Sequence, residues 1–314
     1  MAHSTENIAL ALDLHRMGKS LKDISEQTRI PERTLRYYFN HSGNARVLVL
    51  SDLHCGHRAG LTPPQHQLNI ASKWGKLQKE VWDWFERTVE NLKPITHCFV
   101  MGDIIDGKGD RSGGTEQITT DRNVQIEMAC EALALVQAQV YTMVYGTPYH
   151  TGTGEDWESQ VAYRLPQYHQ CHVSIGNHKQ ILINGICFDL KHKTAGTSVP
   201  YGMYTSLAKT KVHNREWAER NGQMRADIFI RGHVHHFDYC GNNTFLSMSL
   251  PALQSWGSKY GEKMCEGVVN TGLVWMDIPY HATKLSHVNW HEQIAEFEHQ
   301  RMAVPDYEHR QSSG

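Results

Sequence analysis

The sequence lacks the cysteine pattern of a disulfide-stabilised protein. Its 314 residues include seven cysteines, an odd number, and no two of them are spaced as C-x-x-C. Disulfide frameworks and thiolate zinc sites usually depend on such paired cysteines. We therefore expect reduced thiols in a reducing compartment.

Long apolar runs and a strong excess of one charge are missing as well. No uninterrupted apolar stretch approaches the roughly 20 residues of a membrane-spanning helix, and no basic segment followed by an apolar one opens the chain. We expect no membrane association and a cytoplasmic location. The 31 basic and 33 acidic residues give a net charge of −2, so contact with nucleic acid would depend on a local basic patch.

Histidine, by contrast, is abundant, with 21 residues. Hydrophobic residues make up 40% of the chain and charged residues 20%, which is typical of a folded globular protein. Because histidine is a common ligand of transition metals, its abundance prompts a search for metal-binding clusters.

Residues 1–42 are predicted to form a separate, all-α module. Gly18 ends a first helix, Ser20 caps a second, and a third helix follows the turn at Pro31. Apolar residues recur at helical spacing over the first two helices, at Leu10, Leu14, Met17, Leu21 and Ile24.

Residues 46–300 alternate strand-like and helix-like segments, which is typical of layered α/β proteins. Apolar or alternating runs predict strands at 46–50, 96–103, 140–146, 171–175, 180–192, 226–236, 244–249 and 271–278. Longer amphipathic stretches predict helices at 77–92, 124–139, 155–165 and 203–220. Residues 303–314 are polar, and we expect them to form a disordered tail.

Four of the predicted strands end in side chains that can bind metal ions. The residues, in chain order, are Asp52 and His54, then Asp103 and Asp106, then His192, then His233 and His235. Open α/β sheets place their sites at the carboxyl ends of strands. Mixed carboxylate and imidazole ligands suit Mn, Fe, Zn or Ni, and a carboxylate can bridge two ions about 3.5–4 Å apart.

Each motif alone has a simpler explanation. The D-x-H triplet can be a strand-end turn, GDIIDG a turn stabilised by its own aspartates, His192 a structural histidine, and GHVHH a solvated hairpin end. Their order, with each motif closing a strand-like run, is much more specific and favours metal binding.

On these motifs, residues 46–280 resemble the calcineurin-like metallophosphoesterase family. The segment SDLHCGHRAGLTPP, 51–64, is similar to phosphoesterases of phages and prophages, which implies the cytoplasm of a bacterial host or phage-infected cell. The resemblance implies a four-layer α/β/β/α sandwich, with helices outside two mixed sheets. It further implies hydrolysis of phosphate esters by a hydroxide that bridges two metal ions.

The resemblance also implies the ligands of two divalent ions. One ion would be held by Asp52, His54, Asp103 and His235. The second would share Asp103, which is thereby part of the catalytic machinery, and take His192 and His233. Manganese is favoured among Mn, Fe, Zn and Ni.

One part of the sequence departs from the family pattern, which carries G-N-H-D or G-N-H-E after its third strand. Here GTPYH occupies that place, with Thr147 after the glycine and His150 three residues later. A literal GNHK occurs at 176–179, between two strand-like runs as in a hairpin turn. We favour His150 over His178 as the catalytic histidine, and its role as metal ligand or general acid stays open.

Three further residues are candidates near this site. Asp106 either orients a ligand histidine or a bound water, or caps a turn. Lys108 and Arg111 lie in the glycine-rich loop 107–123 and either bind phosphate or belong to a solvated surface loop.

The N-terminal module resembles the helix-turn-helix modules of resolvases and phage regulators. Its third helix would present Arg33, Arg36 and Tyr37 to DNA. Residues 1–40 contain six basic and five acidic residues, a small excess for DNA binding, so a structural or protein-docking role is the alternative.

The sequence thus favours a dinuclear-metal phosphoesterase that cleaves phosphodiester bonds of nucleic acids or nucleotides. One alternative is a phosphomonoesterase that acts on proteins or small molecules. Another is a DNA-binding regulator with a vestigial phosphoesterase domain, although the complete ligand set argues against decay. Substrate, metal identity and oligomeric state stay open.

Overall fold

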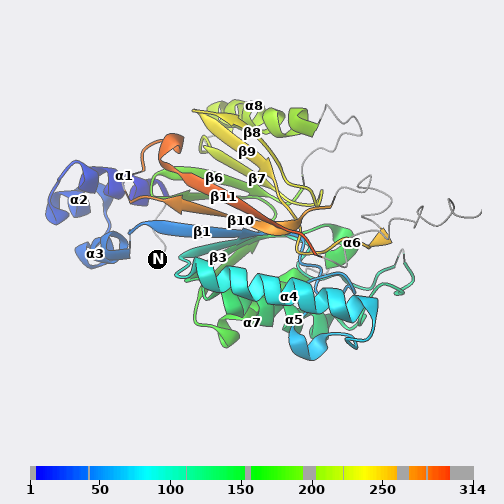
Figure 1. Cartoon of the computed structure of the whole chain (residues 1–314). Coiled ribbons are helices and arrows are strands. Elements are labelled where there is room, and N and C mark those ends of the chain that lie inside the picture. Colours follow the sequence, from blue (N-terminus) through cyan, green and yellow to red (C-terminus); the bar gives the residue numbers. More distant parts are fainter. Residues whose placement is uncertain are drawn as a thin grey trace, which may run out of the picture.

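Two stacked β-sheets form the centre of the computed structural model, and helices cover their outer faces (Figure 1). The structure describes residues 5–41, 43–110, 112–152, 157–193, 203–221, 223–259, 269–280 and 282–297. The predicted tail 303–314 lies outside these residues. In the described part of the chain, no helix is long and apolar enough to cross a membrane.

The first sheet has six strands in the order β11-β10-β1-β2-β3-β4. Strands β1 (Ala45–Leu50), β2 (His97–Val100), β3 (Val140–Val144) and β4 (His172–Gly176) are parallel, while β10 (Thr271–Ile278) and β11 (Asn289–Ala295) are antiparallel additions. The connections between the parallel strands contain helices α4 (Lys73–Leu92), α5 (Arg122–Val136) and α7 (Trp157–Tyr168). Burial on both faces explains the nearly continuous apolar run of β1.

The second sheet has five strands in the order β5-β6-β7-β9-β8. Its strands are β5 (Lys179–Ile183), β6 (Ile186–Lys191), β7 (Ile228–Arg231), β8 (Asp238–Asn242) and β9 (Phe245–Ser249). Helix α8 (Met203–Asn221) packs on its outer face, against β8 and β9. The two sheets bury a common apolar layer in which the rings of Phe99 and Phe188 lie 5.2 Å apart. This is the α/β/β/α layer order that the family resemblance implies.

Two details of the sequence prediction were wrong. The single strand predicted at 180–192 is a hairpin of β5 and β6, because Asn184 and Gly185 both have positive φ, as a tight Asn-Gly turn requires. The GNHK segment is not a hairpin turn, because β4 belongs to the first sheet and β5 to the second. It connects the two sheets.

The N-terminal residues form three helices, α1 (Thr5–Arg16), α2 (Leu21–Thr28) and α3 (Glu32–His41). Ser20 caps α2 by accepting a hydrogen bond from Asp23 N at 3.2 Å. The helices share a small core of Ala11, Leu14, Ile24, Ile30 and Leu35. Leu10 and Met17 face solvent, so they are not part of this core. The domain boundaries at 1–42 and 46–300 stay a prediction.

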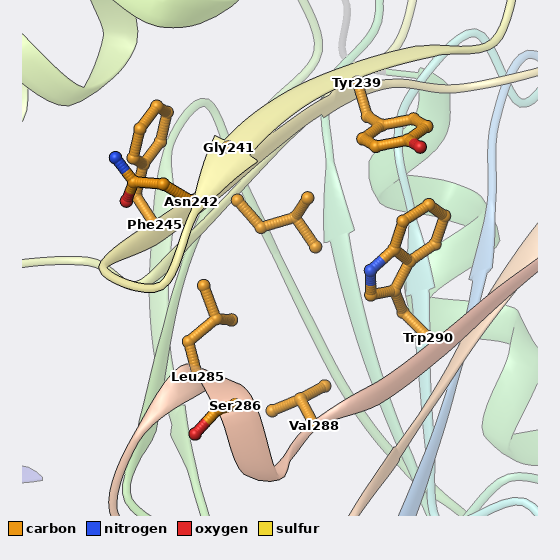
Figure 2. A pocket seen from close by; sticks show the side chains of 9 residues that line it. Tyr239, Gly241, Asn242, Phe245, Leu285, Ser286, Val288 and Trp290 are labelled. Atoms are coloured by element: carbon orange, nitrogen blue, oxygen red, sulfur yellow. The ribbon is translucent and has the colours of Figure 1, made fainter.

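An apolar cavity of about 320 Å³ lies between the open edges of the two sheets (Figure 2). The rings of Tyr239 and Trp290, 4.7 Å apart, form one wall. Trp290 lies opposite Met276 near the end of β10, which pairs with the start of β1. The cavity is therefore at the opposite end of the sandwich from the carboxyl end of β1, and none of the described residues that line it is charged.

The fold predicts a pH dependence of stability at His97, at the start of β2. Burial lowers its pKa to about 4, whereas an unfolded histidine has a pKa of about 6.5. Between these values the unfolded chain binds more protons, so stability falls as the pH drops through this window. We expect His97→Gln to reduce the loss of unfolding free energy between pH 7 and pH 5 by about 1–2 kcal/mol in urea titrations. His213→Gln, at an exposed position of α8, is the control, and an equal effect there would refute the assignment.

Candidate metal centre

The loops that follow the ligand-bearing strands are hydrogen-bonded to one another. Asp52 N donates to Gly102 O at 3.1 Å and His54 N to Asp103 O at 2.9 Å, which ties the loop after β1 to the loop after β2. In the second sheet, Gly232 N donates to His192 O at 2.8 Å. Parallel pairing thus brings residues that are far apart in the sequence to the same end of the sandwich, where these strands have their carboxyl ends.

Five of the six predicted ligands share an uncommon backbone conformation. Left-handed φ angles between 46° and 76° occur at Asp52, His54, Asp103, His233 and His235. Such angles cost roughly 1 kcal/mol or more for an L-residue, and they gather at functional sites where the surroundings enforce them. The sharp turns let residues two apart, such as Asp52 and His54, direct their side chains to one place.

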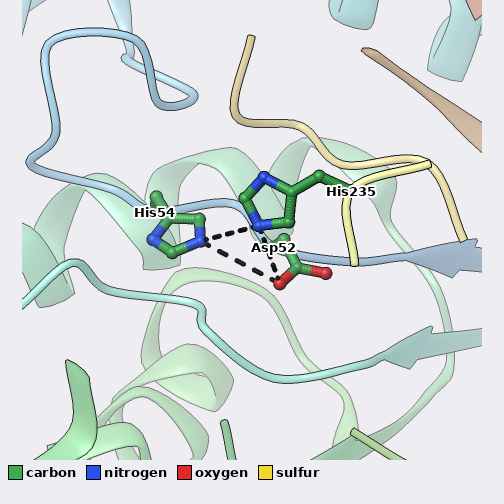
Figure 3. A group of neighbouring side chains, drawn as sticks. All are labelled: Asp52, His54 and His235. Atoms are coloured by element: carbon green, nitrogen blue, oxygen red, sulfur yellow. Dashed lines mark hydrogen bonds and ion pairs between the residues drawn. The ribbon is translucent and has the colours of Figure 1, made fainter. Parts of the chain in front are cut away.

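A first group consists of Asp52, His54 and His235, all buried (Figure 3). The Nε2 atoms of the two histidines lie 3.3 Å apart. From Asp52 Oδ1, the distance to Nε2 is 3.2 Å for His235 and 3.9 Å for His54. Burial raises the pKa of Asp52, but His235 outweighs this and holds it well below its usual range.

The donor set of this group fits a divalent cation. Asp52 Oδ2 accepts hydrogen bonds from Ser51 Oγ and, at 3.0 Å, from His233 N. Asp52 Oδ1 is buried and, among the described residues, has no hydrogen bond of suitable geometry. A buried carboxylate oxygen without a donor is costly, and a cation shared with the two imidazoles would remove that cost.

A second group consists of Asp103, His192 and His233. Asp103 Oδ2 lies 3.1 Å from His192 Nε2 and 3.9 Å from His233 Nδ1. His192 Nδ1 donates to Met101 O, which leaves Nε2 to face the carboxylate. The predicted ligands therefore fall into two groups, with Asp103 in the second.

Asp103 and His192 stabilise each other's charge. Burial raises the pKa of Asp103, but His192 and His150 hold it well below its usual range. Burial lowers the pKa of His192, but the Asp103 carboxylate reverses this and raises it to about 10. Because an imidazole must be neutral to bind a metal, an ion at this group would displace the His192 proton.

Asp106 and His150 lie beside His54. His54 Nδ1 donates to Asp106 Oδ1 at 2.9 Å, which directs Nε2 of His54 toward the first group. His150, on α6 (Pro148–Thr151), donates from Nδ1 to Asp106 O at 2.8 Å, and its Nε2 lies 4.0 Å from Asp103 Oδ2. Gln117 Nε2 donates to the other oxygen of Asp106. Asp106 therefore fixes the ring of His54, while its role in metal binding stays a prediction.

His178 has a different environment. Its Nε2 lies 2.7 Å from Asp189 Oδ2, and the other oxygen of Asp189 accepts from Arg231 Nη2 at 2.7 Å. The buried Asp189–Arg231 pair joins β6 to β7, the strands before His192 and His233. His150 forms a third group with His54 and Asp106, whereas His178 belongs to none of the groups found among the described residues.

The loop after Asp106 is attached to the metal centre. Ile118 N donates to Gly56 O at 2.7 Å, and the buried Gln125 amide binds both N and O of Gly107. Lys108 is exposed on this loop. Arg111 lies outside the described residues.

Two residues at this site were missed by the sequence analysis. Thr147 donates to Asp103 Oδ1 from its backbone N at 2.6 Å and from its hydroxyl at 3.2 Å. Glu158, on α7 and fully buried, accepts from Ile104 N at 2.6 Å and from Gly146 N at 2.7 Å. Burial and the nearby Asp103 raise the pKa of Glu158 to about 7. Glu158 therefore joins the loops after β2 and β3.

Gly146 is the one sequence signal for this contact. A Cβ at this position would lie 2.0 Å from Asp103 Oδ1, so only glycine lets the two loops approach so closely. Glu158 itself carries no signal, because a single acidic residue in the first turn of a helix is ordinary.

No protein-family model and no curated protein matches the chain. Among solved structures, an archaeal phosphodiesterase is 12% identical to this chain, with a TM-score of 0.42. The match covers 80% of this chain and 99% of the phosphodiesterase. Vacuolar Protein Sorting 29 from Cryptosporidium parvum is 10% identical, with coverage of 81% and 100% and a TM-score of 0.41. Zinc-complexed Vps29 from Entamoeba histolytica is 14% identical, with coverage of 79% and 98% and a TM-score of 0.38. The function of this chain is therefore inferred from its own geometry.

The site predicts an effect of Glu158→Gln on metal affinity. The glutamine amide has one NH2 group, which cannot accept a hydrogen bond, so the bond from Ile104 N or from Gly146 N is lost. The loops that carry Asp103 and Thr147 are then no longer joined, and Asp103 loses its fixed orientation. We expect Mn²⁺ to bind about tenfold more weakly in isothermal titration calorimetry. Asp227→Asn, which alters a carboxylate bound to Cys187 N in the second sheet, should leave the affinity unchanged. Equal affinity of the Glu158→Gln and unsubstituted proteins would contradict the assignment.

Proposed function

We propose that the chain is a dinuclear-metal phosphoesterase that hydrolyses phosphodiester bonds of nucleic acids or nucleotides. The observation that carries the proposal is that the predicted ligands form two Asp/His groups at one end of the sandwich. His150 links them, since its ring lies 4.6 Å from His54 and its Nε2 4.0 Å from Asp103 Oδ2. Two such groups suit two ions better than one.

In this proposal Asp52, His54 and His235 hold one ion, and Asp103, His192 and His233 hold the other. The ions, with Mn favoured among Mn, Fe, Zn and Ni, would activate water and neutralise phosphoryl oxygens. Asp106 fixes the ring of His54, while Thr147 and Glu158 fix Asp103. These contacts keep the ligands oriented before substrate arrives.

His150 is proposed as the general acid. Burial lowers its pKa, but Asp103 and Asp106 outweigh this and raise it. Its Nδ1–H is held by Asp106 O, so the proton available for transfer is on Nε2. When the P–O bond breaks, His150 gives this proton to the leaving oxygen and stays as the neutral Nδ1–H form.

The helices α1–α3 are proposed to bring the enzyme to nucleic acid. Arg33 and Arg36 are exposed on α3, and Arg36 lies 3.7 Å from Glu32. Tyr37 belongs to α3, but its side chain lies outside the described residues. Exposed arginines on one helix can grip phosphates or contact base edges.

Activity on model substrates tests the proposal. With Mn²⁺, we expect hydrolysis of bis-p-nitrophenyl phosphate to exceed that of p-nitrophenyl phosphate. Asp103→Asn removes one carboxylate charge between the ligands and should lower kcat/KM about a hundredfold or more. Asp110→Asn, at an exposed position of the following loop, is the matched control.

Other outcomes of this assay favour the alternatives. A preference for the monoester would favour a phosphomonoesterase. Absence of activity together with absence of bound metal would favour a DNA-binding regulator with a vestigial domain.

The role of α3 has its own test. We expect the double substitution Arg33→Ala and Arg36→Ala to weaken binding of duplex DNA about tenfold and to reduce its salt dependence, because phosphate contacts release counterions. Electrophoretic mobility shifts at several salt concentrations measure both. Arg215→Ala on α8 should have no effect, and unchanged DNA affinity of the double variant would refute the recruitment role.

A further inference from the structure

A basic and aromatic surface borders the metal centre. It consists of Arg58, Lys73, Trp74, Trp256 and Lys259, and we refer to it as the rim. The segment 254–259 runs beside the segment 52–59, since Gln254 N donates to Asp52 O at 2.8 Å and Ser255 N to Ala59 O at 2.7 Å. The rim is therefore connected directly to the loop that carries Asp52 and His54.

Arg58 is held in place and partly exposed. Its guanidinium carbon lies 4.3 Å from the centre of the Trp74 ring, and Nη2 donates to Glu116 Oε1 at 3.1 Å. The side chain is 26% exposed, so part of the guanidinium faces solvent. A guanidinium that is already fixed in place loses little entropy when it binds an anion.

The two lysines extend the positive surface. Lys73 Nζ lies 5.2 Å from the Trp74 ring and 5.9 Å from the Trp256 ring, and the residue is exposed. Lys259 is exposed, and its backbone N also donates to Glu116 Oε1. Of the three cations, Arg58 forms an ion pair with Glu116, whereas Lys73 and Lys259 have no ion pair within 4.0 Å among the described residues, so the two lysines add positive charge that Glu116 does not balance.

Glycine at 257 shapes the rim. Gly257 has a φ of +103°, and a Cβ there would lie 2.9 Å from the Trp74 ring. The close approach of this loop buries one edge of the indole. Trp74 is therefore a platform for Arg58 and Lys73 rather than a free surface for a base.

We propose that the rim binds the backbone phosphates of a nucleic-acid strand that continues beyond the scissile phosphodiester. This inference rests on the proposed function, because it assigns the scissile phosphate to the metal centre. A single phosphate monoester would occupy that centre and leave the rim unused. A polynucleotide carries further phosphates in both directions, and the rim cations can bind those phosphates.

The test measures binding of a fluorescein-labelled single strand of about six nucleotides, long enough for one groove of this kind and shorter than the site that a helix-turn-helix module reads. Fluorescence anisotropy is recorded at several salt concentrations with the full-length chain carrying Asp103→Asn, which is expected to slow turnover strongly. In this background, we expect Arg58→Ala to weaken binding about tenfold and to reduce the salt slope by about one, as for loss of one phosphate contact.

Lys73→Ala is the second variant, because Lys73 is exposed and its substitution leaves the fold intact. We expect it to weaken binding about threefold, since it removes one of the three rim cations. Arg87→Ala is the matched control. Arg87 is exposed on the same helix, fourteen residues and so about 21 Å from Lys73, and its loss should leave affinity unchanged.

Three results would overturn the proposal. Unchanged binding in both Arg58→Ala and Lys73→Ala would remove the rim from recognition. An equal loss in Arg87→Ala would show general attraction instead of a site. Equal competition by an acidic peptide would show that the occupant is not a nucleic acid.

The proposed function is judged separately, by hydrolysis of bis-p-nitrophenyl phosphate by the unsubstituted protein. This small diester does not reach beyond the metal centre. If the diester is hydrolysed but the rim variants bind the oligonucleotide unchanged, only the proposed role of the rim is refuted. If the diester is not hydrolysed but the rim variants bind the oligonucleotide more weakly, the proposed function is refuted and the rim remains a nucleic-acid-binding surface.

Discussion

The site depends on one constraint, the burial of two carboxylates at the carboxyl ends of β1 and β2. Asp52 is fully buried and Asp103 is 1% exposed, and their charges repel each other. An ionised carboxylate without partners is very costly to bury. The imidazoles of His192 and His235 compensate part of this charge, and divalent ions between the groups would compensate the rest. The histidine-rich strand ends thus supply both the ligands and the charge balance.

Holding these groups in place requires a rigid frame. The left-handed turns at Asp52 and Asp103 persist because hydrogen bonds between neighbouring loops enforce them. Glu158 adds a carboxylate that joins two loops, and the Asp189–Arg231 pair joins the two strands that precede the other ligands. The apolar layer between the sheets holds the two sheets together, so that both ligand groups lie at the same end of the sandwich.

Charge is distributed locally on a chain that is nearly neutral as a whole. The rim places an excess of positive charge next to the metal centre, while Arg33 and Arg36 lie on the N-terminal helices. These helices precede the start of β1 and Asp52 follows its end, so the two regions are attached to opposite ends of a strand that is roughly 20 Å long. In the proposed function they would act on different parts of one nucleic acid, the rim near the cleaved bond and α3 at a distance.

The sequence by itself determined the layered α/β pattern, the strand ends and the ligand types, because alternating apolar runs and the residues that close them are local features. It left Asn184–Gly185 inside one long strand and gave no sign of β11 or of the clustering of Arg58 with Lys259. The tertiary structure alone decided that Thr147 and Glu158 hold Asp103 and its loop in place, and that His178 pairs with Asp189. Contacts of this kind join residues from 11 to more than 100 positions apart, and only sheet pairing and core packing bring such residues together.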